Sequence, residues 1–283
     1  MERLTRASKR LLAVSPVTMV ALLPHVALAQ SDGGMGFSSQ AAFTLFLVDE
    51  NDQVLPNRQI TEIVRRWNTP DGGHAPGHSA CPVPNSCLGG HTPAQCNTGP
   101  NGAGCVIVLT SREVGTSIRF EMRFVENGQE RSLLTRNKIN ITSRGGPNIQ
   151  SSMVGRPGQG STFVLIGSTT THPNNHYCRS AFCEDLTQLA SEYNARWSRR
   201  LAYNDSSLIK GGLFDISANW QPPHNLHRTG RDQDVRANGA ADSIPFNSEI
   251  RQWFVTRITA IFGRAPLLES SGTSNEHYHI FGE

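Results

Sequence analysis

The stretch SIRFEMRFV, residues 117–125, is the clearest β-strand signal in this chain. Apolar side chains alternate with charged ones along most of it. A β-strand with one buried face needs this period of two, because successive side chains point to opposite sides of the strand. Asn127-Gly128 follows and is a strong signal for a tight hairpin turn, with a return strand beginning over 131–134. The sequence therefore predicts an antiparallel hairpin here.

Further short apolar runs, bounded by turn residues, lie on both sides of this hairpin. No helical pattern separates them, so each is expected to be another strand. They are residues 43–48, 54–55, 106–109, 139–141 and 163–166. Strands at this spacing predict an all-β sandwich over residues 41–167, with a Cys-rich insertion at 69–105.

The start of this region also carries a family likeness. Residues 47–56 read LVDENDQVLP, which resembles the valine-aspartate-x-aspartate-x-x-x-x-proline opening of bacterial immunoglobulin-like modules. The resemblance implies an immunoglobulin-like sandwich that serves as a spacer or an adhesive module.

The pattern changes in the C-terminal part of the chain. Residues 168–173 are expected to form a linker. Apolar residues then recur at helical spacing over 185–203 and again over 248–262. These features predict a compact α+β domain over 174–283, which is long enough to bury its own core.

Smaller signals add detail to this domain. Asn247 or Ser248 can cap the start of the second helix, and Gly263 can end it. Residues 211–216 read as a turn into a strand between the two helices.

Composition excludes some classes of protein. The chain has 283 residues, with 26 basic and 23 acidic side chains and a formal net charge of +3. Its apolar content is ordinary, so a folded core is expected rather than disorder. The small net charge gives no case for a nucleic-acid partner.

Residues 1–29 have the features of a secretory signal. A positively charged start precedes a mostly apolar stretch, and Ala27-Leu28-Ala29 offers a cleavage site. A membrane anchor is the alternative, but Pro16 and Pro24 shorten the apolar run below the about 20 residues that a spanning helix needs. No later segment is expected to span a membrane. We therefore expect a chain exported to the periplasm or beyond the cell, with a flexible lead-in over 30–40.

The six cysteines all follow this signal, and an even number outside the cytoplasm favours disulfides. Cys178 and Cys183 are close in sequence and are expected to pair. The other four lie in the insertion at 69–105, which disulfides would pin. A metal site within the insertion is an alternative, because it also holds three histidines, His74, His78 and His91.

The first group of candidate functional residues lies in HNLHRTGRDQD, residues 224–234. His227 and Asp234 are seven residues apart, and Thr229-Gly230 between them can turn the chain so that both side chains point at one ion.

The second group is EHYH, residues 276–279. On a strand, His277 and His279 would face the same side. One of them could then bind a metal ion while the other serves in acid/base work or stabilises a transition state.

Zinc suits such a set of side chains. A catalytic zinc usually has three protein ligands and one open position for water. Two histidines and one carboxylate leave the ion with a net positive charge, which lowers the pKa of bound water.

The pattern H-x-x-H-x-x-G-x-D-x-D over 224–234, followed by H-x-H at 277–279, resembles the penicillin-insensitive murein endopeptidases. These belong to a wider group with lysostaphin, the D-Ala-D-Ala metallopeptidases and the hedgehog N-terminal domain. The resemblance implies a zinc enzyme that cuts peptide cross-links or D-amino-acid-containing peptides of bacterial cell wall, with peptidoglycan or its peptides as the partner. It also implies that His227, Asp234 and His279 are the zinc ligands.

By the same resemblance, His277 would be a catalytic histidine that does not bind the metal, and His224 a further active-site histidine. Glu276 lies three residues before His279, which is the E-x-x-H spacing of the D-Ala-D-Ala dipeptidase branch, where the glutamate is the general base. The base is therefore either His277 or Glu276. The chain departs from the family pattern at two positions that tend to be apolar, Arg231 and Gln233.

Other polar residues are interpreted more simply. Asp232 is placed to orient a ligand imidazole. Residues 204–207 are expected to form a loop that could line the cleft. His172 and His176 are expected in a linker turn, and Asp215 is interpreted as a structural residue at the start of a strand.

Two other classes of function compete with the peptidase. One is a non-enzymatic, zinc-stabilised binding module of the cell envelope. The other is an adhesion or envelope-structural protein in which the β-domain matters most. The presence of both candidate bases, His277 and Glu276, favours the enzyme.

Overall fold

A computed structural model describes most of the chain after residue 32. The described residues are 33–51, 53–76, 88–92, 96–100, 105–112, 114–135, 138–143, 151–221, 226–239, 241–242 and 244–283. The expected signal at 1–29 lies outside them. Within the described part, strands predominate and two α-helices occur. Neither of these helices is long and apolar enough to cross a membrane.

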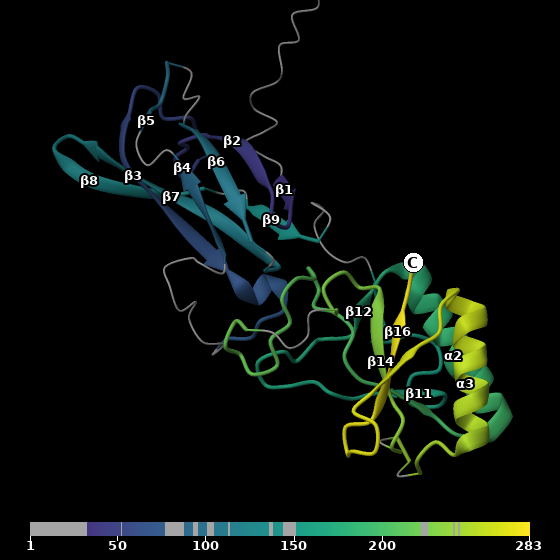
Figure 1. Cartoon of the computed structure of the whole chain (residues 1–283). Helices are drawn as coiled ribbons and strands as arrows, with labels where there is room; N and C mark the ends of the chain where they lie inside the picture. Colours follow the sequence, from purple (N-terminus) through teal and green to yellow (C-terminus); the bar gives the residue numbers. More distant parts are fainter. Residues whose placement is uncertain are drawn as a thin grey trace, which may run out of the picture.

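The strands of the N-terminal half form two sheets that share one apolar core. The larger has the order β1-β9-β7-β3-β5, with β8 on β7, and the smaller has the order β2-β6-β4. Figure 1 shows these strands together at one end of the molecule. Their bounds are β1 Gly33–Gly36, β2 Gln40–Leu45, β3 Gln59–Asn68, β4 Gly89–Thr92, β5 Cys96–Asn97, β6 Cys105–Ser111, β7 Thr116–Glu126, β8 Gln129–Leu134 and β9 Ile139–Thr142.

The predicted hairpin is present as β7 and β8. Glu126 pairs with Gln129 across the turn, and the turn residues Asn127 and Gly128 have φ values of 53° and 75°. Asn-Gly is favoured there because both positions of this turn type require positive φ. The alternating apolar side chains of β7 are buried in the core.

Strand β3 pairs with β7 along most of its length, but the sequence pattern does not predict it. A register shift between Ile60 and Glu62 explains why. An extra residue in one strand breaks the alternation of apolar side chains, so that Ile60 and Ile63 both face the core. The period of two is lost at that point.

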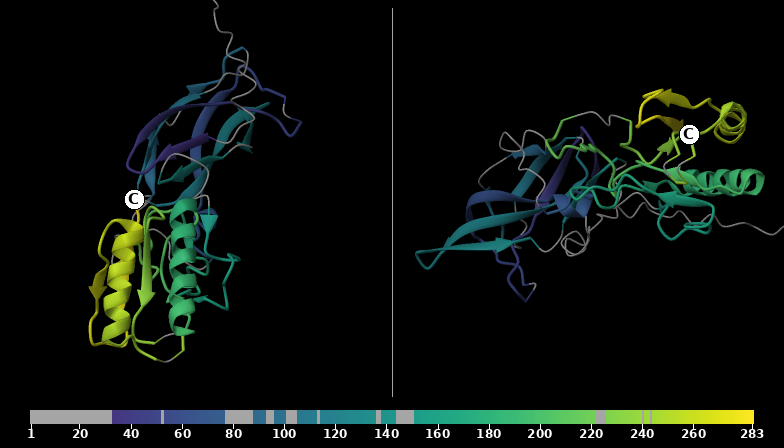
Figure 2. Two further views of the ribbon diagram at one scale, coloured as in Figure 1. Left: turned by 90° about the vertical axis from the view of Figure 1, so that its right-hand side faces the viewer. Right: turned by 90° about the horizontal axis from the view of Figure 1, so that it is seen from below.

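The C-terminal part contains a five-stranded sheet of order β11-β13-β14-β16-β15. Figures 1 and 2 show the two helices, α2 and α3, on one side of this sheet. Their apolar side chains pack with those of the strands in a second core cluster. The bounds are β10 Ser151–Ser152, β11 Phe163–Leu165, β12 Tyr177–Cys178, α2 Ser180–Trp197, β13 Leu201–Tyr203, β14 Asp232–Arg236, α3 Ser248–Phe262, β15 Leu267–Glu269 and β16 His277–Phe281.

The structure corrects three expectations for this part. Strand β11 was expected in the N-terminal sandwich, but it pairs with β13 and belongs to the C-terminal sheet. The first helix ends at Trp197, and Leu201 starts β13 instead of extending the helix. Residues 211–216 form no regular strand and make only isolated bridge contacts.

The second helix begins and ends where the sequence indicates. The side chain of Asn247 accepts a hydrogen bond from the backbone N–H of Ile250 at 2.9 Å, which caps the helix. Gly263 follows the last turn with a φ of 70°, a conformation that glycine adopts without cost from a side chain.

Two disulfides join described cysteines. Cys178 and Cys183 pair as expected and connect β12 to the first turn of α2. Cys96 and Cys105 pair within the Cys-rich insertion. The insertion's other two cysteines, Cys81 and Cys87, lie outside the described residues.

Three glycines allow backbone segments from distant parts of the chain to touch. A Cβ atom at Gly72, which ends the 3-10 helix η1 (Thr69–Gly72), would lie 1.6 Å from the carbonyl oxygen of Gly115. A Cβ atom at Gly115 would in turn lie 2.4 Å from the carbonyl oxygen of Gly211, and one at Gly211 would lie 2.3 Å from that of Arg228. The loop before β14 is thereby packed, through Gly211, against the N-terminal strands.

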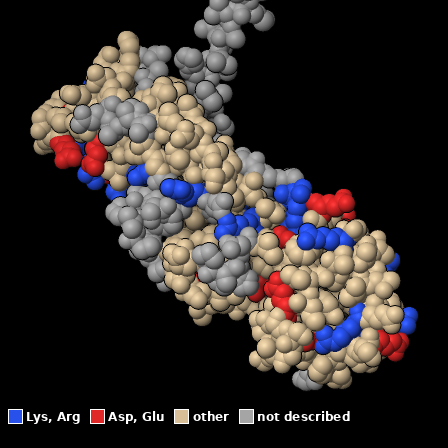
Figure 3. Space-filling view, viewed as in Figure 1, with Lys and Arg blue, Asp and Glu red and all other residues tan. Residues whose placement is uncertain are grey.

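Charges are mixed on the surface. On the face shown in Figure 3, basic and acidic side chains both occur and neither sign covers the face. This agrees with the small net charge and offers no basic stripe for nucleic acid.

Candidate functional site

The first candidate site lies on the face of the C-terminal sheet opposite to the helices. Tyr278 and Ile280 of β16 join the core cluster beneath the helices. The alternate residues, His277 and His279, therefore point to the other face, as their spacing predicts. Asp234 of β14 pairs directly with His279 across the two strands.

This register brings side chains of β14 and β16 into contact. The Nδ1 atom of His279 lies 2.8 Å from Oδ1 of Asp234. Directly opposed residues of antiparallel strands have their Cβ atoms about 5 Å apart, so a carboxylate and an imidazole meet easily. Strand pairing alone thus fixes two of the three predicted ligands.

The third predicted ligand comes from the loop before β14. Gly230 turns this loop with a φ of 70°, and its carbonyl oxygen accepts a hydrogen bond from the backbone of Arg179 at 2.9 Å. The Nε2 atom of His227 then lies 3.2 Å from Oδ2 of Asp234. The turn predicted at Thr229-Gly230 thus brings the side chain of His227 to that of Asp234.

The three residues form a buried cluster. One ligand atom from each of His227, Asp234 and His279 lies within 4.8 Å of the other two. Their exposed fractions are 2%, 1% and 1%. Buried groups of this composition could hold a metal ion.

Electrostatics within the cluster favour positive charge beside Asp234. Burial would raise the pKa of Asp234, but the charge of His227 and hydrogen bonds with both histidines outweigh it and hold the pKa well below its ordinary range. Burial lowers the pKa of His279, but hydrogen bonds to Asp232 and Asp234 outweigh this and raise it to about 9. A divalent cation could supply this positive charge instead, since metal binding competes with protonation.

His277 lies beside this cluster. Its Nε2 atom is 3.5 Å from Oδ2 of Asp234 and 3.2 Å from Oε2 of Glu269. Its Nδ1 atom is 2.6 Å from the carbonyl oxygen of Asn275. A carbonyl oxygen only accepts hydrogen bonds, so Nδ1 carries a proton and Nε2 is the atom available for proton transfer.

Glu276 has different partners. Its carboxylate accepts hydrogen bonds from Arg251 of α3, from the backbone of Gly272 at 2.8 Å and from Ser271 at 3.3 Å. The hydrogen bond from Arg251 is the main cause of a lowered pKa for Glu276. These contacts place Glu276 on the helix side of β16, whereas His277 faces Asp234.

Two more carboxylates lie near the cluster. Asp232 is 3.4 Å from Nε2 of His279, where it can orient that ring as expected. Asp205 accepts a hydrogen bond from Asn175 at 2.7 Å, and burial, reinforced by the charge of Asp234, raises its pKa to about 7. The backbone N–H of Asp234 donates to the carbonyl oxygen of Asp205 at 2.9 Å, so the loop at 204–207 reaches the site.

His224 lies outside the described residues. Glu269 and Asp205 are neighbours that no sequence spacing pointed to. Asp205 stands in a loop with no motif, and Glu269 reaches His277 only because β15 pairs with β16.

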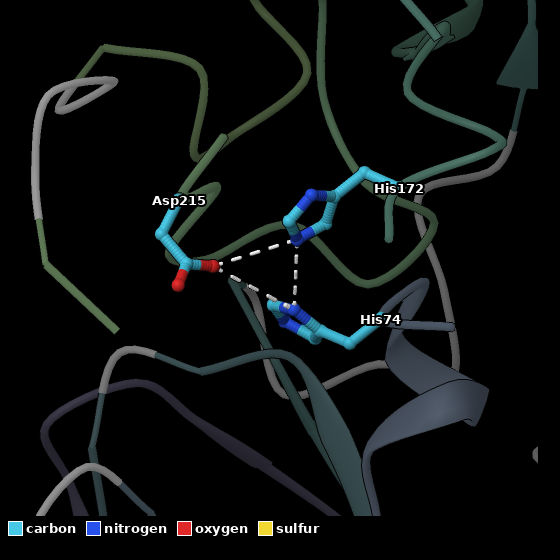
Figure 4. Close-up of side chains that lie close together, drawn as sticks. All are labelled: His74, His172 and Asp215. Atoms are coloured by element: carbon cyan, nitrogen blue, oxygen red, sulfur yellow. Dashed lines mark hydrogen bonds and ion pairs between the residues drawn. The ribbon is translucent and has the colours of Figure 1, made fainter. Parts of the chain in front are cut away.

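Three residues interpreted as structural or assigned to the insertion form a second buried group, shown in Figure 4. These are His74, His172 and Asp215, and each could offer one ligand atom to a metal ion. The alternative of a metal site within the insertion would join His74 to His91, but His91 lies in β4 with its ring against Phe120. His172 is fully buried and is not a simple linker turn. His78 lies outside the described residues.

Comparison with known proteins gives no family assignment, because no protein-family model and no curated protein matches the chain. Inferences about function therefore depend on the residues and geometry of the chain itself.

Proposed function

We propose that this protein is an exported zinc metallopeptidase that hydrolyses peptide cross-links, or D-amino-acid-containing peptides, of bacterial cell wall. The observation that carries the proposal is the convergence of His227, Asp234 and His279 from two separate segments on one buried point. Their order and spacing are those of the murein endopeptidase pattern. Peptidoglycan or its peptides would be the substrate.

The donor set fits zinc. Two imidazoles and a carboxylate are common zinc ligands, and three protein ligands leave one position for a reactant. The ion would supply a positive charge that polarises a peptide carbonyl and makes water a stronger nucleophile. Asp234 contacts His279 through Oδ1 and His227 through Oδ2, so both imidazoles lie against its carboxylate.

His277 is the residue we assign to proton transfer. The carbonyl of Asn275 fixes its Nδ1–H, so Nε2 can take a proton from the attacking water and pass it to the leaving amine. Glu269 is 3.2 Å from Nε2 and can accept a hydrogen bond from the ring once it is charged. Glu276 is already engaged by Arg251, which favours His277 over Glu276 as the base.

The proposal extends to organisation and place. The N-terminal strands β1–β9 would form an immunoglobulin-like spacer or adhesive domain, and the C-terminal sheet with α2 and α3 the peptidase domain. The two disulfides among described residues are typical of proteins outside the cytoplasm. They support a location in the periplasm or outside the cell.

A second candidate is a non-enzymatic, zinc-stabilised binding module of the envelope. The near-complete burial of the three ligands favours it, because a metal ion that only stabilises a fold needs no access for substrate. The two candidates differ in what they require of His277, since a binding module has no use for a proton acceptor.

Digestion of purified peptidoglycan separates the candidates when the released fragments are measured by mass spectrometry. The parent chain should release peptide fragments, and His277→Ala should lower the rate about 100-fold or more while zinc content stays unchanged. His227→Ala should abolish both zinc binding and digestion. Unchanged digestion by His227→Ala contradicts the proposal, and zinc binding without any digestion by the parent supports the binding module.

A further inference from the structure

The second buried group joins three segments that are far apart in the sequence. His74 follows η1 beside the N-terminal strands, His172 precedes β12, and Asp215 lies in the loop after Gly211-Gly212. All three side chains are fully buried, with exposed fractions of 0%. Figure 4 shows them pointing toward one another.

The three facing atoms form a compact triangle. Nδ1 of His74 lies 3.2 Å from Nε2 of His172, and Oδ1 of Asp215 lies 3.4 Å from the latter and 3.9 Å from the former. A tetrahedral ion with ligands at about 2.0–2.1 Å separates its ligand atoms by about 3.3–3.4 Å. Two of the observed separations, 3.2 and 3.4 Å, are close to the edges of such a tetrahedron, and the third, 3.9 Å, is longer.

Outer contacts fix the direction of two of these side chains. Nδ1 of His172 lies 3.3 Å from Oγ1 of Thr171, which turns Nε2 toward the triangle. The backbone N–H of Trp220 donates to Oδ2 of Asp215, which turns Oδ1 toward the histidines. Residues that bind a metal usually have their remaining polar atoms held in this way.

Aromatic rings make the surroundings of the group apolar. The ring centroids of Trp220 and His74 lie 5.0 Å apart, and those of Phe214 and His172 lie 5.1 Å apart. A divalent cation could bind the carboxylate and both ring nitrogens at once, and its charge would offset part of the cost of burying the carboxylate.

We propose that His74, His172 and Asp215 form a second metal site, which binds a divalent cation of the zinc class and ties the segment after η1 to two loops of the C-terminal part. Imidazole ligands favour zinc or a similar transition metal, whereas magnesium and calcium prefer oxygen ligands alone. The role is structural, because the group is fully buried. A proton-linked triad without metal is the competing arrangement.

The alternative is less consistent with the contacts. In a hydrogen-bonded triad, the middle imidazole would use one ring nitrogen toward the carboxylate and the other toward the second imidazole. Here the same atom, Nε2 of His172, lies nearest to both Asp215 and His74, and both imidazoles face the same carboxylate oxygen. Such convergence on one point is what a shared cation produces.

Zinc content of the full chain, measured by elemental analysis after dialysis, tests the proposal without using enzyme activity. The parent should hold about two equivalents, one for each cluster. His172→Gln and His227→Ala should each hold about one, and the double variant none. His176→Gln is the matched control, because His176 is also buried but hydrogen-bonds to the carbonyl of Ile166 at 2.8 Å and should keep both equivalents.

The results separate this site from the proposed peptidase site. If His172→Gln retains the zinc content of the parent, the second site is overturned whatever the result for His227→Ala. Loss of a buried histidine can prevent folding, so titration of the metal-free parent with Co²⁺ provides a second measurement. Two equivalents that produce tetrahedral absorption bands, or one equivalent that His227→Ala retains, support the proposal. No tetrahedral binding, or one equivalent that His227→Ala loses, overturns it.

Discussion

Glu276 directly precedes His277, the first residue of β16, yet the two differ in every contact that matters for chemistry. His277 faces Asp234 and Glu269, whereas Glu276 is held by Arg251 and the backbone of Gly272. Adjacent residues of a strand point to opposite faces, so one serves the site and the other serves the packing of α3.

This difference predicts opposite effects of substitution. Glu276→Gln should leave peptidoglycan hydrolysis within about tenfold of the parent, but should lower the free energy of unfolding by about 1–3 kcal/mol because a charged hydrogen-bonded pair is lost. His277→Gln should lower peptidoglycan hydrolysis by more than about tenfold, but should leave the free energy of unfolding close to that of the parent. Urea unfolding and digestion rates measure the two effects. Full loss of hydrolysis in Glu276→Gln, with stability unchanged, would reassign the base.

At this scale, sequence spacing predicts the ligand set but not its neighbours. His227, Asp234 and His279 follow a recognisable pattern; strand pairing brings Asp234 and His279 together, and the loop before β14 brings His227 to them. Glu269, Asp205 and the residues around His172 have no such pattern. They lie close together because separate loops and a neighbouring strand meet there, and no local pattern in the sequence indicates which segments will meet.

Helix α3 depends on its first turn. The side chain of Asn247 satisfies the backbone N–H of Ile250, one of the N–H groups that a helix leaves without a partner at its start. Asn247→Ala should therefore cost about 1 kcal/mol of folding stability. Chemical denaturation measures the loss, and Asn247→Asp is the control that keeps an accepting oxygen. Equal loss in both variants would show that the cap contributes nothing.

The segment after α2 is joined to the one before α3 by an ion pair. Arg199 donates two hydrogen bonds to Asp242, at 2.8 and 2.9 Å, and these are the main cause of a lowered pKa for Asp242. A carboxylate with a lowered pKa in the folded state adds stability above its unfolded pKa and loses it as pH falls through the folded pKa.

Asp242→Asn should accordingly lower the free energy of unfolding by about 1 kcal/mol at pH 7. The difference from the parent should shrink below pH 3.8, the ordinary pKa of this carboxyl, and vanish in stronger acid. Thermal unfolding at pH 7, 4 and 2.5 tests this. Asp185→Asn is a control of opposite sign, because burial raises the pKa of Asp185. A constant difference at all three values would contradict the assignment.

Elements with a regular period could be predicted from the sequence, and the others could not. The alternation in β7 and the apolar stripe in α3 lead directly to their positions. Strand β3 is hidden by its register shift. Residue Leu201 continues the apolar stripe of α2 by chance, although Ser198 turns the chain with a φ of 52° before it.

For the molecule as a whole, the contact through Gly72, Gly115 and Gly211 joins the N-terminal strands to the loops that carry both clusters. A Cβ atom at Gly115 would lie 2.4 Å from the carbonyl oxygen of Gly211 and 2.8 Å from Cβ of Lys210. Gly115→Ala should therefore force the two backbones apart and cost about 1–3 kcal/mol or more.

Gly36→Ala is the matched control, because the nearest atom to a Cβ there is Oγ of Ser39 at 3.9 Å. We expect it to unfold at nearly the temperature of the parent, with Gly115→Ala several degrees lower. Equal melting temperatures for both variants would mean that the backbones at Gly115 and Gly211 can move apart without loss of stability. The sequence does not predict this contact, since a glycine in a loop does not say which distant backbone it meets.

Strand β16 lies between β14 and β15 in the sheet, although it follows both in the sequence. A chain that emerges from its N-terminal end must leave the position between those strands open until residues 277–281 arrive. His279 is the last residue of the first cluster to be synthesised, so the cluster is complete only when β16 has paired with β14.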